Sequence, residues 1–93
     1  SLVKLRLERI RFFKKLCQIE GLKLYPSQSN YFMFELLEKN SLEVAGALLE
    51  DNILIKDLTS KIHNGKQYIR LAIRTEEENN MLAKKLKNIL ELI

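Results

Sequence analysis

The sequence predicts an α+β domain, a two-layer sandwich in which three helices cover one face of a small, mostly antiparallel sheet. Apolar residues recur every three or four positions near both ends of the chain, which is the spacing of amphipathic helices. Residues 67–74 alternate between apolar and polar, as a half-buried strand does, and are predicted to form the central strand. A shorter helical pattern at 41–50 separates apolar runs at 30–36 and 53–57. Helices and strands therefore mix along one chain, which indicates a single layered domain.

The composition fits one such domain. Its 93 residues suffice for a modest core, and the 46% apolar and 30% charged fractions are those of an ordinary globular protein. The single cysteine, Cys17, cannot form an internal disulfide and, close to Leu16 and Ile19, is expected to be a small buried hydrophobe. No apolar run approaches the roughly 18 to 20 residues of a membrane span, so we expect a cytoplasmic protein without membrane contact.

The first helix is predicted over residues 2–19, with Gly21 as its C-cap. Its expected apolar stripe consists of Val3, Leu7, Ile10, Phe12 or Phe13, Leu16 and Cys17. Residues 1–15 carry six basic side chains against Glu8 alone, a net charge of +5 (6 − 1). This charge indicates either a solvated outer face or a surface that meets an acidic partner domain.

The middle of the chain predicts two strands around a helix. Residues 22–25 should form a short extended segment before the strand 30–36. Ser41 is predicted to cap the second helix, whose expected buried stripe is Val44, Leu48 and Leu49. This helix joins the strands 30–36 and 53–57, so they should run parallel through a right-handed crossover. The strand 67–74 can then insert between them, antiparallel to both.

The last third of the chain begins with a polar turn that contains Asn64 and Gly65. In the following strand, alternation places Ile69, Leu71 and Ile73 on the face covered by the helices. The open face then holds Tyr68, Arg70, Ala72 and Arg74. Thr75 is predicted to cap the last helix, with Glu78 as its capping-box partner. The expected apolar stripe of that helix is Leu82, Leu86, Ile89, Leu90 and Ile93.

The chain contains no self-contained active site. His63 is the only histidine and falls in a predicted loop, and neither a metal-ligand spacing nor a glycine-rich phosphate loop occurs. The informative residue is Arg70, because a partly buried guanidinium on a central strand needs an anionic partner. Two partners are compatible with the pattern. Arg70 could grip the α-carboxylate of an amino acid through two parallel hydrogen bonds, or form a structural salt bridge with Glu35 or Asp57.

Three segments of the chain resemble a known family. Residues 21–34 (GLKLYPSQSNYFMF), 52–57 (NILIKD) and 68–79 (YIRLAIRTEEEN) occur in that order. They are similar to the "GLKVYPSQANF", "GILVRD" and "YLRIAVRTPEEN" segments of histidinol-phosphate aminotransferases and the related threonine-phosphate decarboxylases. The helices at both ends agree in pattern, so the resemblance covers essentially the whole chain. It implies that residues 1–93 are the C-terminal small domain of a fold-type I enzyme that depends on pyridoxal phosphate.

The resemblance also implies roles for individual residues. Arg70 matches the arginine that binds the α-carboxylate of the substrate. Lys56 matches an arginine that helps to hold a distal phosphate, although lysine keeps the charge and loses the bidentate fork. Asn30 matches a position near the substrate, but an amide that caps the strand explains it equally well. Arg74 and Thr75 are nearer to the decarboxylase members, because the aminotransferases usually have glycine in place of Arg74, so both activities stay open.

The cofactor implied by the resemblance is pyridoxal phosphate, which serves as an electron sink in the full-length parent enzyme. The motifs that hold it belong to a preceding large domain and do not occur here, so this chain alone is expected to be inactive. Expected partners are that large domain of the same polypeptide, an amino-acid or amino-phosphate substrate, and a second subunit of a homodimeric parent. A free-standing ferredoxin-like domain that binds a small ligand or RNA is one competing hypothesis, and a dimerising interaction domain is another. We expect no nucleic-acid partner, because the open face of the central strand offers Tyr68 without a second stacking aromatic.

Overall fold

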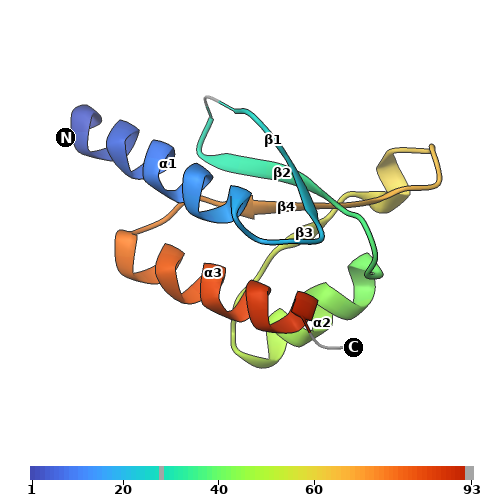
Figure 1. Ribbon diagram of the computed structural model, residues 1–93. Helices are drawn as coiled ribbons and strands as arrows, with labels where there is room; N and C mark the ends of the chain where they lie inside the picture. The colour runs from blue at the N-terminus through green and yellow to red at the C-terminus, as the bar shows by residue number, and fades with distance from the viewer. Residues whose placement is uncertain (28, 92–93) are drawn as a thin grey trace.

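The computed structural model describes residues 1–27 and 29–91. Its elements in chain order are α1 (Leu2–Cys17), β1 (Leu22–Tyr25), β2 (Tyr31–Leu36), α2 (Ser41–Glu50), β3 (Lys56–Asp57), the 3-10 helix η1 (Thr59–Lys61), β4 (Gln67–Ala72) and α3 (Glu76–Glu91). All three α-helices lie on the same side of the sheet (Figure 1). This arrangement confirms the predicted two-layer α+β fold. None of the helices described is both long and apolar enough to cross a membrane.

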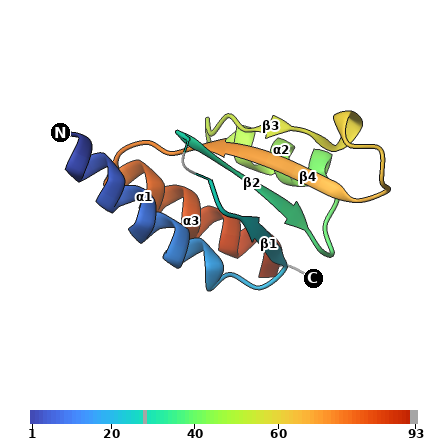
Figure 2. The same ribbon diagram turned by 90° about the horizontal axis from the view of Figure 1, so that it is seen from above.

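The sheet has the strand order β1-β2-β4-β3, and every neighbouring pair is antiparallel. Strands β2 and β3 are therefore parallel to each other, with β4 inserted between them as predicted (Figure 2). The prediction of a strand over 53–57 is wrong in length, because only Lys56–Asp57 pairs with β4. The backbone amides of Asp51, Asn52 and Ile53 still donate to carbonyls of Leu48 and Leu49 at the end of α2. The chain can pair with β4 only after it has left that turn.

The hydrophobic core lies between the helices and one face of the sheet. Strand alternation turns Phe32, Phe34 and Leu36 of β2, and Ile69 and Leu71 of β4, toward the helices. The helices contribute Phe12, Leu16, Val44, Leu48, Leu82 and Leu86, none more than 7% exposed. The ring centroids of Phe12 and Phe32 lie 6.0 Å apart, at a separation that favours aromatic pairs. Burial of each large apolar side chain contributes about 1.5–3 kcal/mol, so these contacts hold α1 against β2.

Helix α1 differs from its predicted stripe. Its buried residues are Phe12 and Leu16, whereas Val3, Leu7, Ile10 and Cys17 are exposed. For Val3 the physical reason is geometric, because the N-terminal end of α1 projects beyond the sheet and the start of α3 (Figure 1). The prediction that Cys17 is buried is thus wrong. The C-cap is Gln18, and Gly21 instead adopts φ +88° in the turn to β1, a conformation that glycine adopts readily.

The predicted N-cap is wrong for α2 and correct for α3. The N-cap of α2 is Asn40, whose side-chain oxygen accepts from the amide of Leu42 at 2.8 Å, so the prediction of Ser41 is wrong by one residue. Leu49, expected in the buried stripe of α2, is exposed. At α3 the prediction is confirmed, since the amide of Glu78 donates to Thr75 Oγ1 at 3.2 Å. Ile93, predicted in the stripe of α3, lies outside the described residues.

Strand β4 ends earlier than predicted, at Ala72 rather than residue 74. The amide of Ile73 still donates to the carbonyl of Asn30 at 2.7 Å. The next amide, that of Arg74, donates instead to Oδ1 of Asn79 on α3 at 2.9 Å. Arg74 therefore turns toward α3 and does not join Arg70 on the open face of the sheet.

Candidate functional site

Arg70 lies on β4 and points to the face of the sheet that the helices leave uncovered. Its direct cross-strand partners are Met33 on β2 and Lys56 on β3. Directly opposite residues of antiparallel strands project to the same face, with Cα atoms about 4.5–5.5 Å apart. The structure thus brings together Arg70 and Lys56, two of the three residues that the sequence singled out.

Tyr31 holds the Arg70 side chain from the neighbouring strand. The guanidinium carbon lies 4.4 Å from the centroid of the Tyr31 ring, within the range of a cation–π interaction. Because Tyr31 is 43% exposed, such a contact contributes about 0.5–1 kcal/mol. Tyr31 pairs directly with Ala72, so it reaches Arg70 along the diagonal of the ladder. The sequence analysis did not identify Tyr31, although strand alternation does place it on the open face.

Arg70 forms neither of the two structural salt bridges that the sequence left open. In the part of the chain that the structure describes, no carboxylate is ion-paired with it. Asp57 is the cross-strand partner of the buried Ile69, so it lies on the helix side of the sheet. Glu35 is opposite Tyr68, one row along the open face. The guanidinium therefore keeps its hydrogen-bonding fork available to an anion from outside.

Both carboxylate oxygens of Asp57 accept hydrogen bonds on the helix side of the sheet. Its Oδ2 accepts from Ser41 Oγ at 2.9 Å, and its Oδ1 accepts from the amide of Thr59 at 2.9 Å. Burial opposes ionisation, but these hydrogen bonds hold the pKa of Asp57 below its ordinary value. The carboxylate is thus ionised at neutral pH and ties β3 to the start of α2. It does not neutralise the positive charges across the sheet.

Asn30 is not brought into the same cluster. It precedes β2 and is exposed, and its backbone carbonyl accepts from the amide of Ile73. Successive residues of a strand point to opposite faces, so Asn30 does not share the open face with its neighbour Tyr31. The observed role of Asn30 is to extend the pairing between β2 and β4 by one hydrogen bond.

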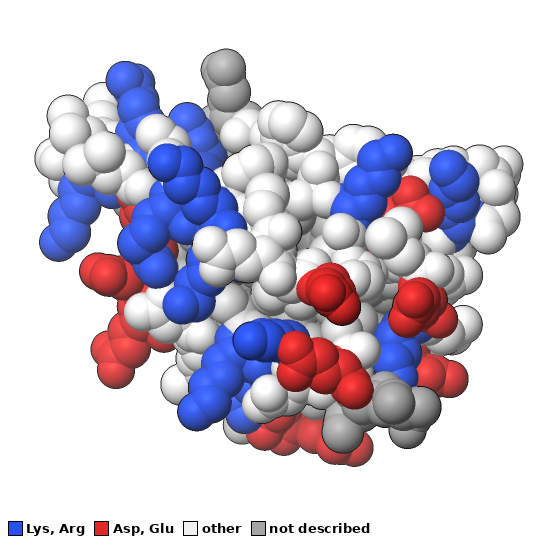
Figure 3. Space-filling model, viewed as in Figure 1, with Lys and Arg blue, Asp and Glu red and all other residues white. Residues whose placement is uncertain are grey.

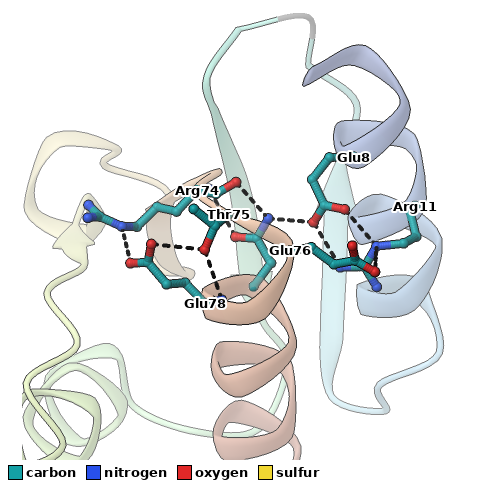
Figure 4. A network of polar contacts seen from close by, with 7 residues as sticks. Glu8, Arg11, Arg74, Thr75, Glu76 and Glu78 are labelled. Atoms are coloured by element: carbon teal, nitrogen blue, oxygen red, sulfur yellow. Dashed lines mark hydrogen bonds and ion pairs between the residues drawn. The ribbon is translucent and has the colours of Figure 1, made fainter. Parts of the chain in front are cut away.

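A polar network fixes the end of β4 to α1 and α3 (Figure 4). Its centre is Asn79, which is 1% exposed. Asn79 Oδ1 accepts from the amide of Arg74, while its Nδ2 donates to the carbonyl of Arg74 at 3.1 Å and to Glu8 Oε2 at 2.7 Å. Sequence reasoning missed this residue. A polar residue in helical register with Leu82 and Leu86 was the signal that could have found it.

Glu8 also anchors the basic helix. Arg11 donates to both of its carboxylate oxygens, from Nε at 2.7 Å and from Nη2 at 2.8 Å. The hydrogen bond from Arg11, helped by that from Asn79, lowers the pKa of Glu8 although burial opposes the shift. Basic side chains gather over α1 at the left of the molecule (Figure 3). Arg11, a basic residue of α1, is thus held in place by Glu8.

Pyridoxal phosphate, the cofactor that the resemblance implies, does not fit the residues described here. A lysine that forms a Schiff base needs a desolvated site or a neighbouring charge that lowers its pKa. In residues 1–27 and 29–91 no lysine is buried. Neighbouring cations lower the pKa of Lys56, but its side chain is exposed to solvent. The described lysines thus offer no desolvated site for the cofactor.

Comparison with known proteins shows the family. The model of the family described as aminotransferase class I and II matches residues 2–86. A threonine-phosphate decarboxylase from Salmonella typhimurium is 34% identical over 86 residues, which cover 92% of this chain and 23% of that protein. A histidinol-phosphate aminotransferase from Methanocaldococcus jannaschii is 32% identical over 82 residues, which cover 88% of this chain and 22% of that protein. The chain thus spans less than a quarter of the length of these curated relatives.

The fold agrees with a solved structure of the same group. A decarboxylase from Sulfurospirillum multivorans superposes with a TM-score of 0.83 at 37% identity, over 90% of this chain and 24% of that one. The range matched by the family model, residues 2–86, includes the sheet, the three helices up to Leu86, and both Arg70 and Lys56. With a family model that matches residues 2–86, the chain belongs to the aminotransferase class I and II family.

Proposed function

We propose that the chain is the C-terminal small domain of a longer enzyme that depends on pyridoxal phosphate, and that it supplies Arg70 to hold the α-carboxylate of the substrate. Members of the family use this cofactor, which stabilises negative charge at the α-carbon of an amino acid. The observation that carries the proposal is the guanidinium of Arg70, which lies on the uncovered face of the sheet beside Tyr31 and has no carboxylate partner among the described residues. A planar guanidinium can orient a carboxylate through two parallel hydrogen bonds.

The exposed half of α1 supports a larger parent protein. Its apolar side chains are exposed by 46% to 80%, and they are Leu2, Val3, Leu5, Leu7 and Ile10. Several large apolar side chains exposed at one end of a helix favour a protein contact there. We propose that a large domain of the same polypeptide, which holds the cofactor, covers this half of the helix. The parent enzyme would be a homodimer in the cytoplasm.

The proposed substrate is an amino acid or amino phosphate, with Lys56 near its distal group. Lys56 supports this assignment because it stands directly opposite Arg70 and carries a charge without an ion-paired carboxylate in the described chain. The leading activity is transamination, the reaction for which the matched family is named. Decarboxylation is the second candidate. It is favoured by the 34% identical relative from Salmonella typhimurium, which is named a threonine-phosphate decarboxylase.

The experiment requires the full-length parent enzyme with its cofactor. Phosphorylated and unphosphorylated amino acids are offered with an oxo-acid acceptor, and amino-group transfer and carbon dioxide release are measured in parallel. Lys56→Ala should lower kcat/KM for phosphorylated substrates and spare the others, because the lost ammonium served only the distal group. Lys66→Ala removes another exposed lysine and should change neither. Equal losses on both substrate classes would contradict the role of Lys56, and the absence of both reactions would contradict the proposed function.

A further inference from the structure

The register of two neighbouring strands brings the ring of Tyr31 to Arg70. Tyr31 begins β2 directly opposite Ala72, and Arg70 lies two residues before Ala72 on the same face of β4. Diagonal neighbours of this kind are about 7–8 Å apart, a span that an aromatic side chain can bridge. Ala72 contributes only a methyl group to this row, which leaves room for the ring to lean along the diagonal. The guanidinium carbon of Arg70 thus comes to lie 4.4 Å from the ring centroid.

The backbone that carries the Tyr31 ring is held by hydrogen bonds just before the strand. Ser29 Oγ donates to the carbonyl of Tyr31 at 3.3 Å, and the amide of Ile73 donates to the carbonyl of Asn30 at 2.7 Å. The second of these bonds continues the pairing of β2 with β4 beyond Tyr31 itself. The ring therefore projects from a backbone that belongs to the sheet and not to the preceding loop.

A contact with an aromatic ring differs from a salt bridge in what it leaves free. A carboxylate partner would occupy the fork of N–H donors on Arg70 and neutralise its charge. The face of an aromatic ring attracts the cation electrostatically and has no carboxylate oxygen to fill that fork. Among the described residues, no carboxylate is ion-paired with Arg70. The ring of Tyr31 can thus restrain the arginine while its charge and donors stay available to a ligand.

We propose that Tyr31 is a positioning residue, which holds the guanidinium of Arg70 in the orientation that grips the α-carboxylate of the substrate. This inference rests on the proposed function and adds a residue that the sequence did not single out. An arginine side chain has many rotamers, and fixing one of them on binding costs conformational entropy. A ring that restrains the guanidinium beforehand lowers that cost. Because the π-system carries this role, phenylalanine should replace Tyr31 and leucine should not.

The geometry is tested in the 93-residue chain by NMR. Protons above the face of an aromatic ring resonate at lower frequency, so the δ-methylene protons of Arg70 should be shifted in the wild-type chain and in Tyr31→Phe. Tyr31→Leu should abolish the shift. Tyr25→Leu is the matched control and should retain it, because Met33 lies between Tyr25 and Arg70 across the sheet. Arg70 signals that are alike in Tyr31→Phe and Tyr31→Leu would overturn the inference.

The role is tested by a double-mutant cycle in the full-length parent enzyme with its cofactor and an amino-acid substrate. Tyr31→Leu should lower kcat/KM about two- to fivefold, the scale of an exposed cation–π contact, and Tyr31→Phe should keep wild-type kinetics. Added to Arg70→Met, Tyr31→Leu should cause no further loss, because the residue through which it acts is gone. Wild-type kinetics for Tyr31→Leu, or its full loss in the Arg70→Met background, would overturn the inference. If the proposed function fails instead, Arg70→Met alone keeps the wild-type kcat/KM.

Discussion

The two faces of strands β2 and β4 are made by alternate residues of the same segments, yet they differ in solvent exposure and polarity. On the helix side, Phe34 and Ile69 are inaccessible to solvent and share one apolar core. On the other side, Tyr31 and Arg70 carry polar groups toward solvent, next to Lys56 of β3. Because side chains alternate strictly along a strand, one backbone can support a stable core and a recognition surface at once. A change on one face should therefore leave the other largely intact.

The largest expected effect comes from the core face. Leu71→Ala should destabilise the chain by about 2–5 kcal/mol, because the cavity it leaves lies in the middle of the core. The matched change on the open face, Arg70→Met, should cost no more than about 1 kcal/mol, the value of the contact with Tyr31. Urea denaturation measures both. If Leu71→Ala does not fold, Ile69→Val, with an expected loss of about 0.5–1.5 kcal/mol, keeps the comparison measurable. Equal losses on the two faces would contradict the division of roles.

The next effect concerns Asn79, which joins the end of β4 to α1. Asn79→Ala removes its three side-chain hydrogen bonds and leaves the part-buried amide of Arg74 without this partner, so a loss of about 1–3 kcal/mol is expected. Asn88→Ala, at an exposed site on the same helix, is the control and should change stability little. The free energies of unfolding in urea give the comparison. Similar free energies of unfolding for the two variants would show that the hydrogen bonds of Asn79 do not stabilise the fold.

A smaller effect should appear in the pH dependence of stability. The folded-state pKa of Glu8 is lowered from 4.5, so its ionised form contributes stability that is complete above pH 4.5 and disappears as pH falls through the lower folded value. The difference in stability between the wild-type chain and Glu8→Gln should thus be largest near neutral pH and shrink in acid. Urea midpoints between about pH 7 and about pH 3 test this. Glu77→Gln, at an exposed acid in the first turn of α3, is the control, and a difference for Glu8→Gln that stays constant with pH would contradict the prediction.

The sequence predicted those features that depend on local periodicity. Strand alternation identified the core residues of β4 and the open-face position of Arg70, and the strand-helix-strand order predicted where β4 inserts. It could not predict how far the helices extend beyond the sheet, so the exposed residues Val3 and Leu7 were expected to be buried. Arg74 continued the alternation but was drawn from the strand by Asn79, which is a contact between elements.

The candidate site shows the same limit. Arg70 and Lys56 were predicted from their segments, and their direct pairing follows from the register of β3 and β4. Tyr31 was missed, because its place beside Arg70 depends on a diagonal of the ladder between β2 and β4. That contact cannot be deduced from the pattern of a single segment.

The most direct test of the account is Arg70→Lys in the full-length parent enzyme, with the melting temperature and kcat/KM measured on the same preparation. If Arg70 anchors the α-carboxylate of the substrate, kcat/KM should fall on the order of 10²-fold while the melting temperature hardly changes, because an ammonium cannot reproduce the bidentate grip that orients the α-carbon. If Arg70 serves only the stability of the sheet, the melting temperature should fall and the kinetics should stay nearly normal. An enzyme that is destabilised but kinetically normal would contradict the account.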